Sequence, residues 1–474
     1  MAPTGYERLS AQDSSFLQFE REGNPAHISA VAIFEPGSLG CASGGIDMER
    51  IRAHILARLD SLPHYRQHLA YTPFQRHPIW VDDAAFDLAH HLHHAGLPSP
   101  GSRTQLAELA GRITSQPLNM KRPLWELWFV EGLPEGRFAA VAKVHHCMVD
   151  GVSGVNVLTT LFSPQADPEV QKARRWKPKP APDVLDFLID GVEDNARLLV
   201  SALRATGEAL QDPLRLAADV RETVVAGWET VSTALTPPAQ VPINGRVGPK
   251  RRLAWRRLAL VELLETKKRL DGSLNDVVLT VVGGAVRSLL QKRRLRLKGI
   301  DFRIVIPVDT RATRADMEVG NRVSSWFLSL PVAERSPLVR FEAIRRQTRR
   351  LKKSNAKAGI ESLMRFADWS GSTRLGSWAV SLTSALKPYN LIVSNVHGPQ
   401  VPLYLLDARL LEFYPHLPLF ANQGLSVTVL SYLDAVYIGL TGDWDLLPDL
   451  DHFADALDTS FQELQEASRK RDCP

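Results

Sequence analysis

The 474-residue sequence has few cysteines and no long hydrophobic run. Cys41, Cys147 and Cys473 lack the paired spacing of a zinc cluster or a disulfide framework, so we expect a reducing cytoplasm and no metal. Four histidines at positions 90–94 lack nearby thiolate or carboxylate ligands, and we expect a solvated surface there. No apolar segment is long enough to span a bilayer, and residues 1–20 lack the apolar core of a secretory signal.

The sequence also lacks a large excess of charge of one sign. The sequence has 57 Lys and Arg against 52 Asp and Glu, a formal net charge of +5, and we expect no nucleic-acid partner. A hydrophobic fraction of 44% with 23% charged residues is ordinary for a folded soluble chain. The length exceeds what one hydrophobic core usually organises, so two domains are expected.

Two adjacent histidines, His145 and His146, follow a predicted buried strand. Residues 138–144 are rich in β-branched and small apolar side chains, and apolar residues recur at helical spacing after position 151. The histidines should therefore lie on the turn between the strand and the helix, a turn that Asp150 and Gly151 favour. Imidazole transfers protons readily near neutral pH. On these residues alone, a capped strand end or a metal site remains an alternative.

The pattern His145-His146-x-x-x-Asp150-Gly151 resembles the HHxxxDG signature of a superfamily of acyltransferases. That superfamily includes chloramphenicol acetyltransferase, plant acyl-CoA transferases and peptide-synthetase condensation domains. Four further segments resemble, in the same order, the bacterial wax ester synthase/diacylglycerol acyltransferase family. They are residues 9–17, 123–126, 275–279 and 394–399. The resemblance extends from about Leu9 to the mid-450s.

The resemblance implies an α/β fold of two chloramphenicol acetyltransferase-like domains. Mixed sheets would be flanked by helices, and the active site would lie at the domain interface. We place the N-terminal domain with the HHxxxDG motif at residues 1–165 and the C-terminal domain at residues 244–474. Residues 166–243 form the linker, which begins with a segment rich in proline and basic residues and continues with amphipathic helices, the first at residues 183–210.

The resemblance also implies the reaction. A long-chain acyl group would pass from acyl-CoA, a substrate and not a cofactor, to a fatty alcohol or diacylglycerol, forming wax ester or triacylglycerol. His146 would be the general base that takes the hydroxyl proton and returns it to the CoA thiolate. His145 would be structural or auxiliary, because adjacent strand residues point to opposite faces, and Asp150 would hold the loop. Cys147 could instead be a nucleophile, but its side chain should diverge from His146.

Other positions are assigned through the family alone. Asn275 and Gly151 are the candidates for substrate contact. The residues expected to support the structure are Pro123, Leu124, Trp125, Asp276, Asn395, Gly398 and Pro399. Two residues depart from the family pattern: Asn119 replaces a frequent Asp, and His397 replaces a usual Pro. His397 could alter the fit of the acceptor, or it could be an exposed loop residue.

Two other functions compete with this interpretation. One is a superfamily acyltransferase that uses another acceptor or a carrier-bound acyl donor. The other is a catalytically silent lipid-binding relative. The intact His145, His146 and Asp150 argue against a loss of catalytic activity. The apolar second half of the chain favours a long-chain substrate over a polar acceptor.

Water-insoluble substrates and the lack of a spanning segment predict contact with lipid at a surface. We expect a cytoplasmic protein that associates peripherally with the inner face of the membrane or with lipid inclusions. Three basic clusters, at residues 250–257, 292–298 and 345–353, could supply the contact. For any one cluster, the alternative is a solvated face of a helix or strand.

Overall fold

The computed structural model describes residues 6–20, 24–41, 45–73, 76–148, 160–167, 169–183, 186–187, 238–309, 323–353, 389–420 and 422–471. Asp150, Gly151 and most of the helix predicted after them lie outside these ranges. The helix predicted at residues 183–210 also falls almost entirely outside them.

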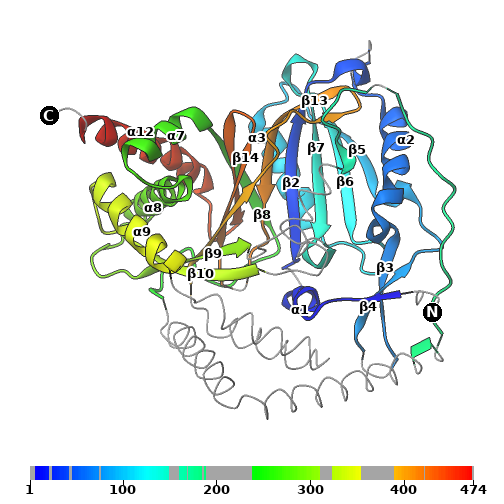
Figure 1. Ribbon diagram of the computed structural model, residues 1–474, viewed down its shortest axis with the longest axis horizontal. Coiled ribbons are helices and arrows are strands. Elements are labelled where there is room, and N and C mark those ends of the chain that lie inside the picture. Colours follow the sequence, from blue (N-terminus) through cyan, green and yellow to red (C-terminus); the bar gives the residue numbers. More distant parts are fainter. Residues whose placement is uncertain are drawn as a thin grey trace, which may run out of the picture.

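Two six-stranded sheets of mixed direction stand side by side at the centre of the molecule (Figure 1). The first sheet has the order β12-β13-β2-β7-β6-β5, in which only β5 and β6 run parallel. Its strands are β2 (His27–Phe34), β5 (Leu92–Gly96), β6 (Trp125–Glu131), β7 (Phe138–His145), β12 (Tyr404–Leu405) and β13 (Ala408–His416). The α/β class with mixed sheets is thereby confirmed.

The second sheet has the order β10-β9-β11-β14-β15-β8. Its strands are β8 (Arg251–Ala259), β9 (Phe302–Asp309), β10 (Val323–Leu330), β11 (Leu391–His397), β14 (Leu425–Tyr432) and β15 (Ala435–Asp443). Every residue of β14 and β15 is buried, because one face of these strands meets helices and the other meets the first sheet. A small third sheet joins β1 (Tyr6–Arg8), β4 (Pro78–Asp82) and β3 (Gln67–Tyr71).

Helices cover the outer face of the second sheet, and others lie beside the first sheet or between it and β8 (Figure 1). Those of the N-terminal half are α1 (Ala11–Phe19), α2 (Met48–Arg58) and α3 (Arg103–Ser115), and those of the C-terminal half are α7 (Leu260–Arg269), α8 (Leu274–Lys292), α9 (Pro337–Lys353) and α12 (Leu450–Arg471). Capping side chains set several helix starts: Ser10 caps α1, and Ser102 with Gln105 forms a capping box on α3. α8 is buried along nearly its whole length because the other three helices pack around it.

The first sheet is completed by a strand from the C-terminal half, which the sequence did not predict. β13 pairs antiparallel with β2, and a register shift between Leu410 and Glu412 interrupts its alternation of buried and exposed residues. Such a bulge removes the period-two pattern by which a strand is identified in sequence. β13 also packs against the second sheet: Tyr414 stacks on Trp255 with ring centroids 5.3 Å apart, and Tyr437 donates a hydrogen bond to the Leu411 carbonyl.

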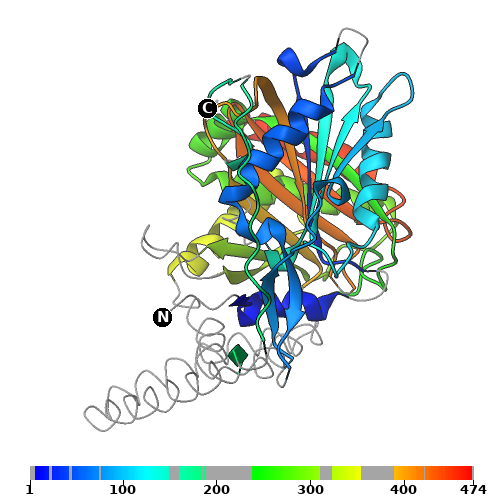
Figure 2. The same ribbon diagram turned by 90° about the vertical axis from the view of Figure 1, so that its right-hand side faces the viewer.

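The basic, proline-rich start of the linker is ordered against the N-terminal half. Residues 169–183 contain no helix or strand and run along the outside of the molecule beside α2 (Figures 1 and 2). The Trp176 indole covers the buried Arg66 guanidinium at 4.8 Å and donates to the Asp83 carbonyl. The Lys179 amide donates to the Asp82 carboxylate. The segment is irregular, and its tryptophan anchors it to the N-terminal half.

The prediction of a solvated histidine cluster is wrong at one position. His91 is buried between the rings of Phe86 and Trp125, and its Nδ1 lies 2.8 Å from the Trp125 carbonyl. Burial lowers the pKa of His91, so it is neutral at pH 7. His90 and His94 are exposed. Within the described ranges, no group of His, Cys, Asp and Glu is arranged to hold a metal.

Membrane-span criteria are not met by any single helix in the described part of the chain. Taken together, α7 and α8 have sufficient length and apolar composition, but they meet at a bend of 100°.

The adjacent glycines of α8 predict opposite effects of the same substitution. A Cβ at Gly284 would lie 2.0 Å from the Ser460 Oγ of α12, whereas a Cβ at Gly283 would make an ordinary 3.7 Å contact with Leu330. We expect Gly284→Ala to lower the free energy of unfolding by about 1–3 kcal/mol through overpacking. Gly283→Ala should raise it by about 0.5–1 kcal/mol through helix propensity. Urea denaturation of the two variants tests the packing, and equal effects would contradict it.

Candidate active site

Both ring nitrogens of His145, the last residue of β7, are engaged by buried partners. The backbone N–H of Cys147 donates to Nδ1 at 3.2 Å, so the ring proton lies on Nε2. Nε2 donates to the Glu20 carboxylate at 3.1 Å. The ring is fully buried and meets His27 edge-on, with centroids 6.1 Å apart. His145 is therefore held as one tautomer in a closed polar site.

His146 lies on a different local structure, because β7 ends at His145 and a short 3-10 turn (His146–Met148) begins. Its backbone N–H donates to the Ala26 carbonyl at 2.9 Å. The ring is half-buried and stacks on Phe16 of α1, with centroids 3.6 Å apart and planes at 17°. The two histidine rings thus have separate surroundings. The cause is the change from strand to turn, in place of the strand alternation that we had expected to separate them.

Cys147 is buried beside His145, with its Sγ 3.0 Å from Nδ1 of that ring. Burial raises the pKa of the thiol well above its usual value, and the nearby Asp13 and Glu20 raise it further. A thiol in this environment stays protonated at neutral pH and is a poor nucleophile. The geometry therefore gives Cys147 a packing role.

The strand next to the histidines supports them directly. The His145 backbone N–H donates to the Leu124 carbonyl at 2.9 Å, and Leu124 is fully buried. Trp125 is also buried, and its indole N–H donates to the Tyr65 carbonyl at 2.8 Å. Pro123 precedes them as a buried residue of the same turn. These residues form packing contacts around β7.

A buried lysine and histidine lie beside the histidine pair. Lys143 donates to the Ile113 and Gln116 carbonyls and lies 2.9 Å from the Glu126 carboxylate. Burial lowers the pKa of Lys143, an effect that Glu126 opposes. Burial also lowers the pKa of His27 well below its usual value, and Lys143 and His145 add to this. His27 is thus neutral at pH 7. Glu20 is the carboxylate that faces both His27 and His145.

The second group of predicted site residues lies on the C-terminal sheet and its central helix. Asn275, in the first turn of α8, accepts a hydrogen bond at 3.4 Å from the amide of Asn395 on β11. Asp276 caps α8 through Ser273 and also accepts a hydrogen bond from Thr348 of α9 at 2.6 Å. The Asp276 carboxylate is therefore occupied by structural partners.

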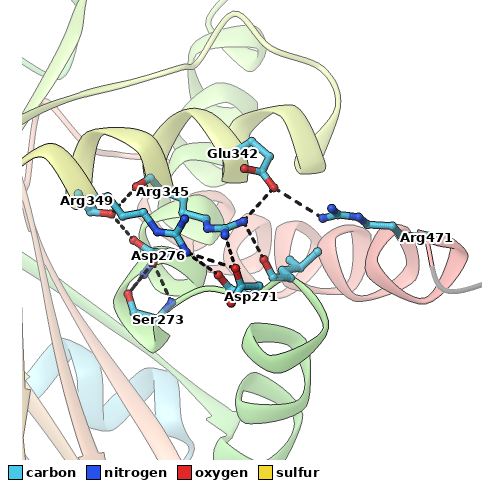
Figure 3. A network of polar contacts seen from close by, with 9 residues as sticks. Asp271, Ser273, Asp276, Glu342, Arg345, Arg349 and Arg471 are labelled. Atoms are coloured by element: carbon cyan, nitrogen blue, oxygen red, sulfur yellow. Dashed lines mark hydrogen bonds and ion pairs between the residues drawn. The ribbon is translucent and has the colours of Figure 1, made fainter.

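Arginines of α9 fix the loop before this helix (Figure 3). Arg345 forms ion pairs with Asp271 and Glu342, and Arg349 contacts the same Asp271 at 3.3 Å. Arg471, at the end of α12, reaches Glu342. This network anchors the start of α8 and with it the position of Asn275.

The turn after β11 depends on a glycine. A Cβ at Gly398 would lie 2.4 Å from the Ser431 carbonyl, which accepts a hydrogen bond from the Gly398 backbone N–H. Pro399 follows in the half-buried part of the turn. His397 is exposed at the end of β11, and exposed Asn119 stabilises its own turn by accepting from the Lys121 N–H. An aspartate could accept the same bond, so this departure preserves the turn.

Glu20 and Phe16 are the site residues that sequence reasoning missed. Both belong to α1 or its end, more than a hundred positions before the histidines, so no local spacing connects them. The available signal was a carboxylate, Glu20, that directly follows the apolar side chains of Phe16, Leu17 and Phe19. Such a charge needs a partner when the segment is buried.

Fold and site together define a class: an α/β protein with two mixed sheets and adjacent histidines after a central strand. The profile of the wax ester synthase/diacylglycerol acyltransferase catalytic domain matches residues 9–278, and that of the WS/DGAT C-terminal domain matches residues 319–465. The chain belongs to the wax ester synthase/diacylglycerol acyltransferase family and is an acyl-CoA-dependent acyltransferase. The family predicted from the sequence motifs is confirmed.

Individual relatives agree. A Mycobacterium tuberculosis protein with the provisional name diacylglycerol O-acyltransferase is 33% identical over 479 residues, covering 98% of this chain and 91% of that protein. The wax ester synthase/diacylglycerol acyltransferase from Marinobacter aquaeolei VT8 has a similar fold, with a TM-score of 0.66, 24% identity, and coverage of 98% and 100%. A starter condensation domain of rhizomide synthetase, in complex with C8-CoA and Leu-SNAC, has a TM-score of 0.59 at 13% identity, with coverage of 98% and 95%.

Removal of the Glu20 carboxylate should destabilise the protein through His145. Glu20→Ala leaves a buried imidazole N–H without its acceptor, which costs about 1–3 kcal/mol of unfolding free energy. In Glu20→Gln the amide oxygen can still accept this bond, so most of the loss should be avoided. Urea denaturation measures both variants. If Gln and Ala destabilise equally, the bond to His145 is not the reason that Glu20 matters.

Proposed function

We propose that the protein transfers a long-chain acyl group from acyl-CoA to a fatty alcohol or diacylglycerol, with His146 as general base. The observation that carries the assignment is that both ring nitrogens of His145 already form hydrogen bonds. Its Nδ1 accepts from Cys147 and its Nε2 donates to Glu20, so neither nitrogen can take a proton without breaking a buried hydrogen bond. His146, the half-buried member of the pair, is then the base.

In the proposed reaction, His146 takes the proton of the acceptor hydroxyl as its oxygen attacks the thioester carbonyl. The carbon–sulfur bond then breaks, and the imidazolium returns the proton to the CoA thiolate, so no acyl-enzyme is formed. The buried, protonated thiol of Cys147 supports direct transfer. We assign Asn275 to the acyl carbonyl, because its bond to Asn395 fixes the orientation of its amide near the end of β11.

The choice of substrates rests on relatives. The names of the relatives specify diacylglycerol O-acyltransferase or wax ester synthase, and the related condensation domain was captured with an acyl-CoA. An assay of purified protein with palmitoyl-CoA and either hexadecanol or diacylglycerol, run in parallel, tests the acceptor class. Ester with neither acceptor, but turnover with a carrier-bound donor or a polar acceptor, would favour the alternative superfamily reaction.

Substitution of the two histidines should separate chemistry from support. His146→Ala should lower kcat by about 10²–10⁴-fold, because a positioned general base is lost, with little change in thermal melting. His145→Ala should retain more activity and melt at a lower temperature, because it empties a buried site. His90→Ala, at an exposed position, is the matched control. The opposite activity ranking would exchange the two roles.

We further propose peripheral association with an anionic lipid surface. The three basic clusters differ in what neutralises them. In the first, Arg251 is buried, Arg256 pairs with Asp455 and Asp458, and Arg257 pairs with Asp434. In the third, Arg345 and Arg349 share Asp271 (Figure 3).

The third cluster exposes three residues that make no ion pair with a described residue, Arg346, Arg350 and Lys352, and the second cluster exposes four. Its exposed members follow or end α8: Lys292, Arg294, Arg296 and Lys298. Each charge near an anionic surface contributes about 1 kcal/mol, which salt screens. This cluster is therefore our candidate for lipid contact at the membrane or at lipid inclusions in the cytoplasm.

Flotation with anionic and neutral vesicles tests this contact. We expect binding to anionic vesicles at low salt that is lost at high salt. Changing the four exposed residues of the second cluster to glutamine should weaken binding, whereas Arg256→Gln and Arg257→Gln should not. Binding independent of lipid charge and salt would point to an apolar anchor.

A further inference from the structure

A cleft between α8 and α12 lies apart from the histidine site. It has a volume of about 490 Å³, within the range of roughly 300–1,000 Å³ typical of small-molecule sites. The second sheet separates α8 and α12 from β7 and α1, which carry the histidine site (Figure 1). At the floor of the cleft, Gly284 lets the Ser460 hydroxyl of α12 approach α8 closely.

A buried guanidinium lines this cleft with three of its five N–H donors unused. Arg340 of α9 is 1% exposed. Its Nη1 donates to the Glu334 and Arg335 carbonyls, but its Nε and Nη2 are buried without a hydrogen-bond partner. Nε and Nη2 form one edge of the group, the fork that binds two oxygens of a carboxylate or phosphate. The buried Ser460 hydroxyl, beside Nη2 across Gly284, also has no hydrogen-bond partner.

The charges around the cleft favour an anion over a cation. Arg287 and Arg335 add positive charge to that of Arg340, and His452 offers a ring nitrogen within 3.2 Å of Ser288. Of the two lining carboxylates, Asp455 is ion-paired with Arg256, outside the set of cleft residues. Glu463 is 56% exposed and approaches Nη2 only to 3.7 Å, too far for a hydrogen bond.

From this geometry we infer that the α8–α12 cleft binds a small phosphate-type oxyanion, held by the Nε–Nη2 edge of Arg340 and by the Ser460 hydroxyl. Two oxygens of the anion accept from the guanidinium and a third accepts from Ser460. The hydroxyls, amide and imidazole along the rim suit a polar organic group attached to the phosphate. The inference is independent of the proposed acyl transfer, since none of these residues belongs to the histidine site.

Titration of inorganic phosphate into the full-length protein, at constant ionic strength against chloride, tests the site. We expect saturable binding by calorimetry and a saturable rise in melting temperature. Arg340→Lys should weaken the affinity about tenfold or more, because lysine cannot reproduce the two-donor edge. Arg293→Lys, which alters the arginine directly after α8 that pairs with Asp449 outside the cleft, is the matched control. A linear, unsaturable response that is equal in all three proteins would overturn the inference.

Glu463→Gln gives a second test in a variant that should fold normally, since the side chain is exposed. If the oxyanion binds Arg340, removal of the neighbouring carboxylate should tighten phosphate binding several-fold, with Ser460→Ala acting in the opposite direction. If Glu463 is instead the permanent partner of Arg340, Glu463→Gln should lower the melting temperature and leave phosphate binding undetectable or unchanged, which contradicts the proposed site.

The origin of the phosphate group can be distinguished with two probes. Arg340-dependent binding of glycerol 3-phosphate without binding to phosphatidate-containing vesicles identifies a soluble phosphate ester. Arg340-dependent binding of phosphatidate vesicles, displaced by inorganic phosphate, identifies a lipid headgroup. Either result supports the oxyanion site. Binding of neither probe, together with no saturable phosphate binding, would refute it.

Discussion

The pairing of β13 with β2 is the constraint on which the arrangement of the two halves depends. It places a strand of the C-terminal half beside β2, and β2 is the neighbour of the histidine-bearing β7. The same strand packs on β15, where Gly439 has no side chain to block the Pro415 carbonyl: a Cβ there would lie 1.8 Å from that oxygen. Because one strand contacts both sheets, neither sheet can move relative to the other without exposing a shared aromatic core around Trp255, Tyr414 and Tyr437.

Within that frame, the two histidines differ through one change of backbone conformation. Because β7 ends at His145, that ring stays in the buried layer with Glu20 and His27, while the 3-10 turn carries His146 onto the ring of Phe16. A buried imidazole with both nitrogens engaged is a positioning element. It ties α1 to the end of β7, and α1 in turn provides the surface against which His146 lies.

Much of this was predictable from local sequence, and the remainder depends on distant partners. Capping residues such as Ser102 and Gln105, the buried strand before His145 and the packing of Trp125 all follow from patterns within a few residues. The carboxylate of Glu20, the ring of Phe16 and the bulged strand β13 acquire their roles from contacts with remote segments. The glycine pair of α8 shows the limit clearly. The two glycines are equivalent in the sequence, but of the pair only Gly284 faces a neighbour near enough to require the absence of a side chain.

Buried polar groups also distinguish the two faces of the C-terminal helices. At the start of α8, the carboxylate of Asp276 is satisfied by Ser273 and Thr348, which fixes the helix end near Asn275. Further along α8, two residues of the helices packed against it, Arg340 of α9 and Ser460 of α12, keep buried donors without partners. An unmade hydrogen bond of a buried group costs about 1–3 kcal/mol, and more for a charged group. A helix layer that satisfies the Asp276 carboxylate at one end and leaves the Arg340 guanidinium edge without acceptors at the other favours an anion at the second position, because a bound oxyanion would recover that cost.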